Sequence, residues 1–117
     1  MTSKDFKEAV DCYTKSIDLF PEDPATYSNR ALAHLRLKEY GKVIEDSNKA
    51  INLKPDYLKA YHRRGKAWAA VNKPELAIKD FQYILEVEPH NREAMKELKA
   101  IRAEMDGGKK KNAPKKA

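Results

Sequence analysis

The sequence contains a single cysteine, Cys12, and only four glycines among its 117 residues. One cysteine cannot form an internal disulfide, which favours a reducing compartment. No apolar run approaches the roughly 18 residues that a membrane-spanning helix needs. The first residues, Met-Thr-Ser-Lys-Asp, also lack the apolar core of a signal peptide. These absences predict a cytoplasmic protein that does not insert into a membrane.

Groups that support catalysis are also scarce. No glycine-rich phosphate loop, Ser/His/Asp set or isolated pair of acids stands out. His34, His62 and His90 are spaced by 28 residues and lack the Cys or acidic partners that complete a metal site. Cys12 has no base near it in sequence, so we expect a buried or half-exposed structural thiol. We therefore predict no catalytic residue, no metal and no cofactor.

The positive charge is concentrated at one end of the chain. The formal net charge is +6, and the five lysines of residues 107–117 account for all but one of these charges. The preceding residues are nearly neutral, which argues against a nucleic-acid-binding face. We expect residues 107–117 to form a disordered, solubilising tail. A nuclear-import signal or a tether to an acidic surface are the alternatives.

The sequence repeats with a period of 34 residues. Prolines recur at this spacing, aromatic residues recur where bulk is needed, and small residues recur where helices approach closely. These positions are Pro21, Pro55 and Pro89, Tyr27 and Tyr61, and Ala31 and Gly65. A period of this length is typical of a helix–turn–helix unit that stacks into a curved solenoid. Solenoids are usually binding proteins, so the pattern favours a binding function.

Amphipathic periodicity and helix-end signals predict six helices in an all-α domain over residues 1–106. Asp23 is placed to cap a helix that begins at Pro24, and Gly107-Gly108 is expected to end the last helix. Met95, Leu98 and Ile101 are expected to pack this last helix onto the preceding unit as a cap. The predicted helices span residues 4–20, 24–37, 40–53, 58–71, 74–87 and 91–105, with the capping segment at 91–106.

The first unit is incomplete in this register. Residues 24–57 and 58–91 are full units, whereas residues 1–23 contain only the second helix of one. We expect the missing helix to leave an apolar stripe exposed that includes Val10, Tyr13 and Ile17. Such stripes favour association. Self-association through this helix, a rearranged helix that covers it, or a longer parent chain are all compatible with the pattern.

Two segments carry a resemblance to a known family. Ala25-Thr-Tyr-Ser-Asn-Arg-Ala31 and Lys59-Ala-Tyr-His-Arg-Arg-Gly65, together with the repeated prolines, resemble tetratricopeptide repeats (TPRs) over roughly residues 4–105. More narrowly, they look like the carboxylate-clamp class found in co-chaperones of the seventy- and ninety-kilodalton heat-shock chaperones. The resemblance implies a TPR solenoid of antiparallel helix pairs. It also implies a ligand peptide that ends in Glu-Glu-Val-Asp.

The residues themselves support an anion-binding groove. Lys59 and Arg63 are four apart and share one face of a helix. Asn29 is one repeat before Arg63 and therefore occupies the equivalent place in the neighbouring unit. If the first helices of the units line the concave side, an amide, an ammonium and a guanidinium converge on a terminal carboxylate. Arg36 and Lys66 are candidates to extend this positive groove.

Two further positions lie beside this set. Ser28 and His62 are equivalent and are candidates for contact with a peptide side chain, a plain surface role being the alternative. Clamp proteins also use a Lys and an Asn from the first helix of the first unit, which this sequence does not supply. We therefore predict a partial clamp with weak affinity for chaperone tails. The alternatives are a scaffolding module that uses its convex face or N-terminal helix, or a regulatory TPR fragment of a larger enzyme.

Overall fold

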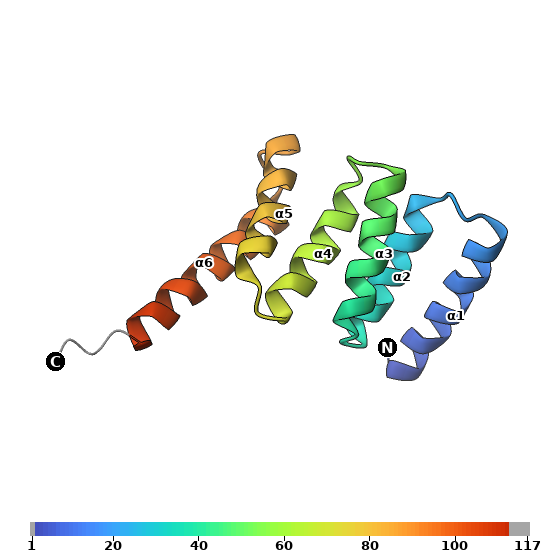
Figure 1. Cartoon of the computed structure of the whole chain (residues 1–117), viewed down its shortest axis with the longest axis horizontal. Helices are drawn as coiled ribbons and strands as arrows, with labels where there is room; N and C mark the ends of the chain where they lie inside the picture. The colour runs from blue at the N-terminus through green and yellow to red at the C-terminus, as the bar shows by residue number, and fades with distance from the viewer. Residues whose placement is uncertain (1, 113–117) are drawn as a thin grey trace.

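The computed structural model describes residues 2–112, with side chains up to residue 107. This part of the chain is entirely helical and contains no strand, which confirms the predicted all-α class (Figure 1). The helices are α1 (Ser3–Leu19), α2 (Pro24–Arg36), α3 (Tyr40–Leu53), α4 (Leu58–Ala70), α5 (Pro74–Val87) and α6 (Arg92–Asn112). None of these helices is long and apolar enough to cross a membrane.

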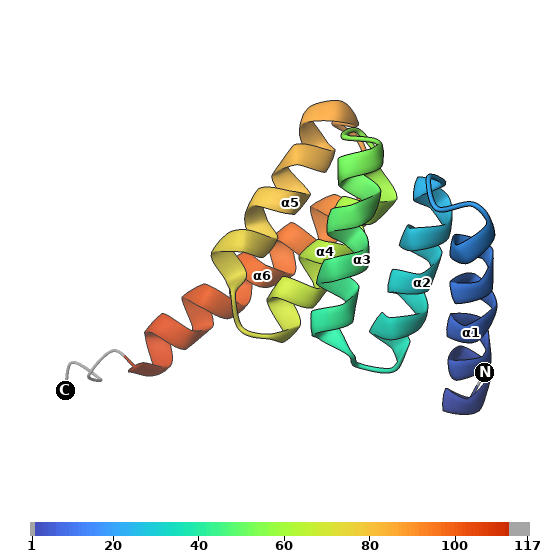
Figure 2. The same ribbon diagram turned by 45° about the vertical axis from the view of Figure 1, so that its right-hand side comes forward.

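The helices form an elongated solenoid of 61 × 32 × 21 Å. Each helix packs against the next one in sequence; in addition, α2 packs against α4, and α4 against α6. Helices α2, α4 and α6 therefore form one layer, and α1, α3 and α5 form the other, as the two ribbon views show (Figures 1 and 2). We call the layer of α2, α4 and α6 the inner layer.

Local sequence signals fix most helix ends. Asp23 Oδ1 accepts a hydrogen bond from the Ala25 amide at 3.0 Å, and Pro24 is the first residue of α2. Helices α3 and α5 begin and end where the sequence predicted, whereas α2 and α4 each end one residue earlier. The turns that follow α2 and α4 pass through Lys38 (φ 60°) and Asn72 (φ 63°), which are one repeat apart and both left-handed.

The last helix is longer than predicted. Asn91 caps it, because its Oδ1 accepts a hydrogen bond from the Ala94 amide at 2.8 Å. It then continues through Gly107 to Asn112 instead of ending at the two glycines. A glycine costs a helix only about 1 kcal/mol relative to alanine, so it need not stop one. The predicted disorder of residues 107–112 is therefore not observed, and residues 113–117 lie outside the described residues.

The packing face of α6 differs from the prediction at one position. Leu98 and Ile101 are buried as expected, but Met95 is 51% exposed, so its predicted role in the cap is wrong. Ala94 is fully buried in its place. The buried positions 94, 98 and 101 follow the four- and three-residue steps of one helix face. A small residue there lets the start of α6 approach α5 closely.

One arginine in each full repeat links three helices. In the first full repeat, Arg30 Nε and Nη2 donate to the Asp46 carboxylate at 2.8 and 2.7 Å. Its Nη1 donates to Thr14 Oγ1 on α1 at 3.1 Å. The equivalent contacts one repeat later join Arg64 to Asp80 at 3.0 and 2.7 Å and to Asn48 at 2.9 Å. Each arginine thus ties an inner helix to the outer helix of its own unit and of the unit before.

The tyrosines of the repeat anchor the inter-repeat loops. Tyr27 donates its hydroxyl hydrogen bond to the Pro21 carbonyl at 2.9 Å, and Tyr61 donates to the Pro55 carbonyl at 2.7 Å. The proline loop is therefore held against the start of the following inner helix in both repeats. Together with the arginine contacts, these bonds set how neighbouring units stack.

The N-terminal helix is less exposed along its stripe, and more exposed at its end, than predicted. Val10, Tyr13 and Ile17 are half-buried because α2 packs against α1. The exposed apolar residues are instead Leu19 (73%) and Phe20 (66%), at the corner between α1 and α2. Cys12 is exposed rather than buried or half-exposed, so the prediction for this thiol was wrong.

Candidate functional site

A cavity of about 380 Å³ lies between α4, the end of α5 and the start of α6. Three of the predicted site residues, Lys59, His62 and Arg63, line it from α4. Apolar and polar residues complete the lining. They are Leu58 and Ile84, with Glu88, Asn91 and Glu93 from the α5–α6 region. We call this space the inner cavity.

Arg63 is the most unusual cation of the inner cavity. It is half-buried, its Nε atom is inaccessible and lacks a hydrogen-bond partner, and it forms no ion pair with any described residue. Burial lowers the pKa of its guanidinium; the nearby Glu93 carboxylate raises that pKa, and the Arg36 guanidinium lowers it further. A partly desolvated cation without a bonded counter-charge favours the arrival of an anion.

Two predicted site residues, Asn29 and Arg36, lie on α2. Arg36 is exposed and close enough to Arg63 to affect its pKa, although the two come from different repeats. Asn29 lies two helical turns before Arg36 and is also exposed, so it shares that face of α2. Asn29 does not line the inner cavity. It lies on α2, the inner helix that packs against the Lys59- and Arg63-bearing helix α4.

Two other predicted positions have roles that local spacing did not reveal. Lys66 Nζ lies 3.2 Å from Glu97 Oε2, so its charge is directed toward α6 and is already paired. Ser28 is fully buried, and its predicted contact with a peptide is therefore wrong. The serine is sealed beneath the inner face, whereas its equivalent His62 reaches the cavity wall.

His62 combines a packing role with a place in the inner cavity. Its ring meets the Phe81 ring edge-on, with centroids 5.6 Å apart and an interplanar angle of 79°. Burial lowers the pKa of His62, which favours the neutral ring, and its Nε2 atom is buried without a hydrogen-bond partner. His62 thus forms part of the cavity wall. Its neutral ring provides a polar atom but no positive charge.

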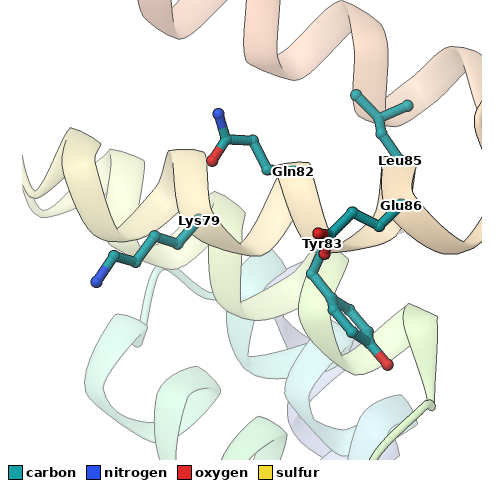
Figure 3. Close-up of a pocket in the computed structure, with 5 residues that line it drawn as sticks. All are labelled: Lys79, Gln82, Tyr83, Leu85 and Glu86. Carbon is teal, nitrogen blue, oxygen red and sulfur yellow. The ribbon is translucent and has the colours of Figure 1, made fainter.

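The outer surface of α5 provides a useful contrast. Figure 3 shows a shallow depression lined by Lys79, Gln82, Tyr83, Leu85 and Glu86. The Tyr83 ring packs 4.4 Å from the Tyr61 ring, so this tyrosine serves the helix contact. None of these residues lines the inner cavity. Lys79 and Glu86 are therefore suitable charged controls for residues of the inner layer.

The described side chains do not bring together three His, Cys, Asp or Glu residues that could hold a metal ion. The two buried aspartates instead form ion pairs with arginines, Asp46 with Arg30 and Asp80 with Arg64. These pairs were missed from the sequence. The signal was present, since both the arginines and the aspartates are one repeat apart.

The comparison with known proteins decides the family. The tetratricopeptide repeat model matches residues 24–57. A solved structure described as "First TPR of Spaghetti (RPAP3) bound to HSP90 peptide SRMEEVD" is 44% identical, with a TM-score of 0.85 over 88% of this chain and 82% of that chain. The chain belongs to the tetratricopeptide repeat family. The resemblance inferred from the repeated prolines and aromatic residues is thereby confirmed.

Two further TPR relatives give the scale of the similarity. RNA polymerase II-associated protein 3 of Homo sapiens is 47% identical over 96 residues, which cover 82% of this chain and 14% of that protein. The second TPR domain of human RPAP3, solved in complex with the HSP70 peptide SGPTIEEVD, is 35% identical with a TM-score of 0.79, covering 83% of this chain and 81% of that one. The chain thus spans 14% of the length of this curated relative.

Proposed function

We propose that this TPR domain is a non-catalytic adaptor that binds the acidic C-terminal peptide, of the Glu-Glu-Val-Asp type, of seventy- and ninety-kilodalton heat-shock chaperones. Asn29, Lys59 and Arg63 form its partial carboxylate clamp. The observation that carries the proposal is the half-buried Arg63 guanidinium, which has no ion-pair partner among the described residues and lies beside Lys59 in the inner cavity.

Each clamp residue suits a different part of a terminal carboxylate. The Arg63 guanidinium offers a planar fork, the Lys59 ammonium a mobile point charge, and the Asn29 amide a neutral donor. Arg36 adds positive potential from α2. Lys66 extends the groove less than its spacing suggests, because Glu97 already pairs with it. The relatives solved with SRMEEVD and SGPTIEEVD support this ligand class.

The test is a titration of SRMEEVD against the same peptide with an amidated C-terminus. Each charge-assisted hydrogen bond is worth roughly 1.5–3 kcal/mol, so we expect amidation to weaken binding by about tenfold or more. Lys59→Ala should weaken binding of the free acid by a similar factor, and added salt should weaken it further. Lys79→Ala removes the same charge from the outer surface of α5 and should leave the affinity unchanged.

Two results contradict the proposal. Equal affinity for the free acid and the amide shows that no clamp engages the terminus. An equal loss of affinity in Lys59→Ala and Lys79→Ala shows that net charge, and not the groove, drives binding.

We propose that the protein acts in the cytoplasm. The nucleus is the alternative, because the lysine-rich segment 107–117 could be a nuclear-import signal.

A second candidate function is assembly through the corner between α1 and α2. Phe20 is 66% exposed there, at the repeat position that Lys54 and Glu88 occupy in the other units. An exposed aromatic beside an exposed Leu19 favours self-association. Sedimentation velocity should show a concentration-dependent species that Phe20→Lys abolishes. A wild-type protein that remains monomeric at high concentration excludes this candidate.

A further inference from the structure

The inner cavity is lined by charges of both signs. On α2 and α4, the exposed or half-buried cations Arg36, Lys59 and Arg63 face the groove. On the α6 side, the lining of the inner cavity contributes the two carboxylates Glu88 and Glu93. The inner cavity therefore has cations on its α4 wall and carboxylates on the wall formed by the end of α5 and the start of α6.

The acidic side is held in place by the start of α6. Asn91 caps this helix through its Oδ1 atom, and its Nδ2 atom donates to Glu88 Oε1 at 2.9 Å. Glu93, in the first turn of α6, raises the pKa of both His62 and Arg63. Its carboxylate therefore acts on the α4 wall of the inner cavity. Neither Glu88 nor Glu93 has an ion-pair partner among the described residues.

We propose that the inner cavity receives a basic side chain located upstream of the peptide's acidic terminus. This inference rests on the proposed function and adds a preference to it: the ninety-kilodalton tail, represented by SRMEEVD, over the seventy-kilodalton tail, represented by SGPTIEEVD. Leu58 and Ile84 offer apolar surface for the methylene stem of an arginine. Glu88 and Glu93 offer carboxylates for its guanidinium.

The spacing of the two peptides fits this assignment. In SRMEEVD the arginine precedes the terminal aspartate by five residues, and in SGPTIEEVD a threonine occupies that place. Five extended residues span about 17 Å. Helices pack roughly 8–10 Å apart, so the α2 and α6 axes are separated by about 16–20 Å across α4. If Lys59 and Arg63 hold the terminus from the α2 side of α4, the extended peptide is long enough to carry the arginine to the wall of the inner cavity that Glu88 and Glu93 form. The threonine side chain is too short and has no charge to offer.

The direct test compares SRMEEVD with SAMEEVD on the wild-type domain. We expect the arginine peptide to bind about two- to fivefold more tightly, the upper range of an exposed ion pair. The Glu88→Gln/Glu93→Gln double variant should bring the ratio close to one. Glutamine at position 88 keeps an oxygen acceptor for Asn91 Nδ2, which protects the start of α6. Glu86→Gln removes a carboxylate of α5 that does not line the inner cavity and should keep the wild-type ratio (Figure 3).

A complementary peptide swap tests for a gain. Replacing the threonine of SGPTIEEVD by arginine should raise affinity for the wild-type domain several-fold and leave affinity for the double variant nearly unchanged. A loss of discrimination in the double variant accompanied by this gain in the wild type supports the proposal.

The failure of this inference is distinguishable from the failure of the clamp. If SRMEEVD and SAMEEVD bind equally while amidation still weakens both, the basic subsite is wrong and the clamp stands. A preference for arginine that survives in the double variant overturns the assignment to Glu88 and Glu93. If amidation has no effect on either peptide, the clamp is wrong and the subsite that depends on it is wrong too.

Discussion

The two full repeats, residues 24–57 and 58–91, reach the same arrangement with different cores. Ala31 and Ser47 are both fully buried in the first repeat. Their equivalents in the second are Gly65 and Phe81, and a Cβ atom added to Gly65 would lie 2.8 Å from two Phe81 ring carbons. The missing methyl group makes room for the ring. Equivalent positions therefore change in compensating pairs, and the helix spacing is preserved.

The inner faces of the two repeats differ more than their cores. The first repeat presents Ala25 and Asn29, whereas the second presents Lys59 and Arg63 at the same places. The Arg–Asp pairs and the tyrosine bonds, by contrast, are the same in both repeats. Residues that determine how the units stack are the same in both repeats, whereas residues that face the groove differ. Lys59 and Arg63 thus come from the second unit alone, while both units supply the framework.

The largest expected effect tests whether the two repeats have different cores. Phe81→Ala should lower the free energy of unfolding by about 3–5 kcal/mol, the usual cost of removing a buried aromatic ring. Ser47→Ala at the equivalent place should be neutral or slightly stabilising, because the Ser47 Oγ atom is buried without a partner. Urea unfolding monitored by circular dichroism measures both. Similar losses in the two variants would show that the repeats do not use these positions differently.

The next effect tests the shared framework. Asp46→Ala and Asp80→Ala should each cost about 2–3 kcal/mol, because each leaves a partly buried arginine without its bidentate partner. The two losses should agree, since the side chains of Asp46 and Asp80 are exposed by 8% and 6%. Asp56→Ala, which disrupts a surface pair with Lys54 at 3.8 Å, is the matched control and should change little. A loss in only one repeat contradicts a common framework.

A smaller effect tests whether Gly65 and the Phe81 ring compensate for each other in size. Gly65→Ala should destabilise the fold by about 1–2 kcal/mol, because the clash with Phe81 outweighs the gain in helix propensity. Adding Phe81→Leu relieves the clash, so the double variant should lose less than the sum of the single variants. Thermal or urea unfolding of the four proteins closes this cycle. Additive losses mean that Gly65 and Phe81 are not coupled.

The smallest effect concerns pH and comes from His62 of the second repeat. Burial lowers the pKa of His62, whose equivalent Ser28 does not titrate. A histidine with a lowered folded pKa contributes stability that is present above its unfolded pKa of about 6.5 and is lost as pH falls through the folded value. Wild type should therefore lose more stability than His62→Gln between pH 7 and pH 5. Parallel curves for the two proteins contradict this role.

The helices could be predicted because their signals are local. The recurring prolines, Asp23-Pro24 and the three- and four-residue apolar steps indicate helix ends and faces directly. The shared position of Lys59 and Arg63, the proposed clamp pair, was likewise predictable, since four-residue spacing fixes a shared helix face. The sequence predicted that Met95 is buried, but Ala94 is buried instead. The two residues are adjacent at the edge of the apolar face, and the small side chain of alanine gives little hydrophobic signal.

The remaining features depend on contacts between distant residues. The pairing of Lys66 with Glu97 joins residues 31 apart in sequence, which spacing within one helix cannot show. The acidic side of the inner cavity likewise depends on how α6 starts, where Asn91 holds Glu88. The Arg30–Asp46 framework is a different case. Its repeat period was readable, but only the fold shows that these charges face each other.

A double-mutant cycle between Arg63 and the peptide terminus tests the carboxylate clamp most directly. Isothermal titration would measure four affinities: SRMEEVD and its amide, each with wild type and with Arg63→Met, which keeps an apolar stem for packing. We expect amidation to cost the wild type about tenfold or more and the variant much less, with a coupling energy above about 1 kcal/mol. An identical acid-to-amide ratio in both proteins would mean that Arg63 does not contact the carboxylate.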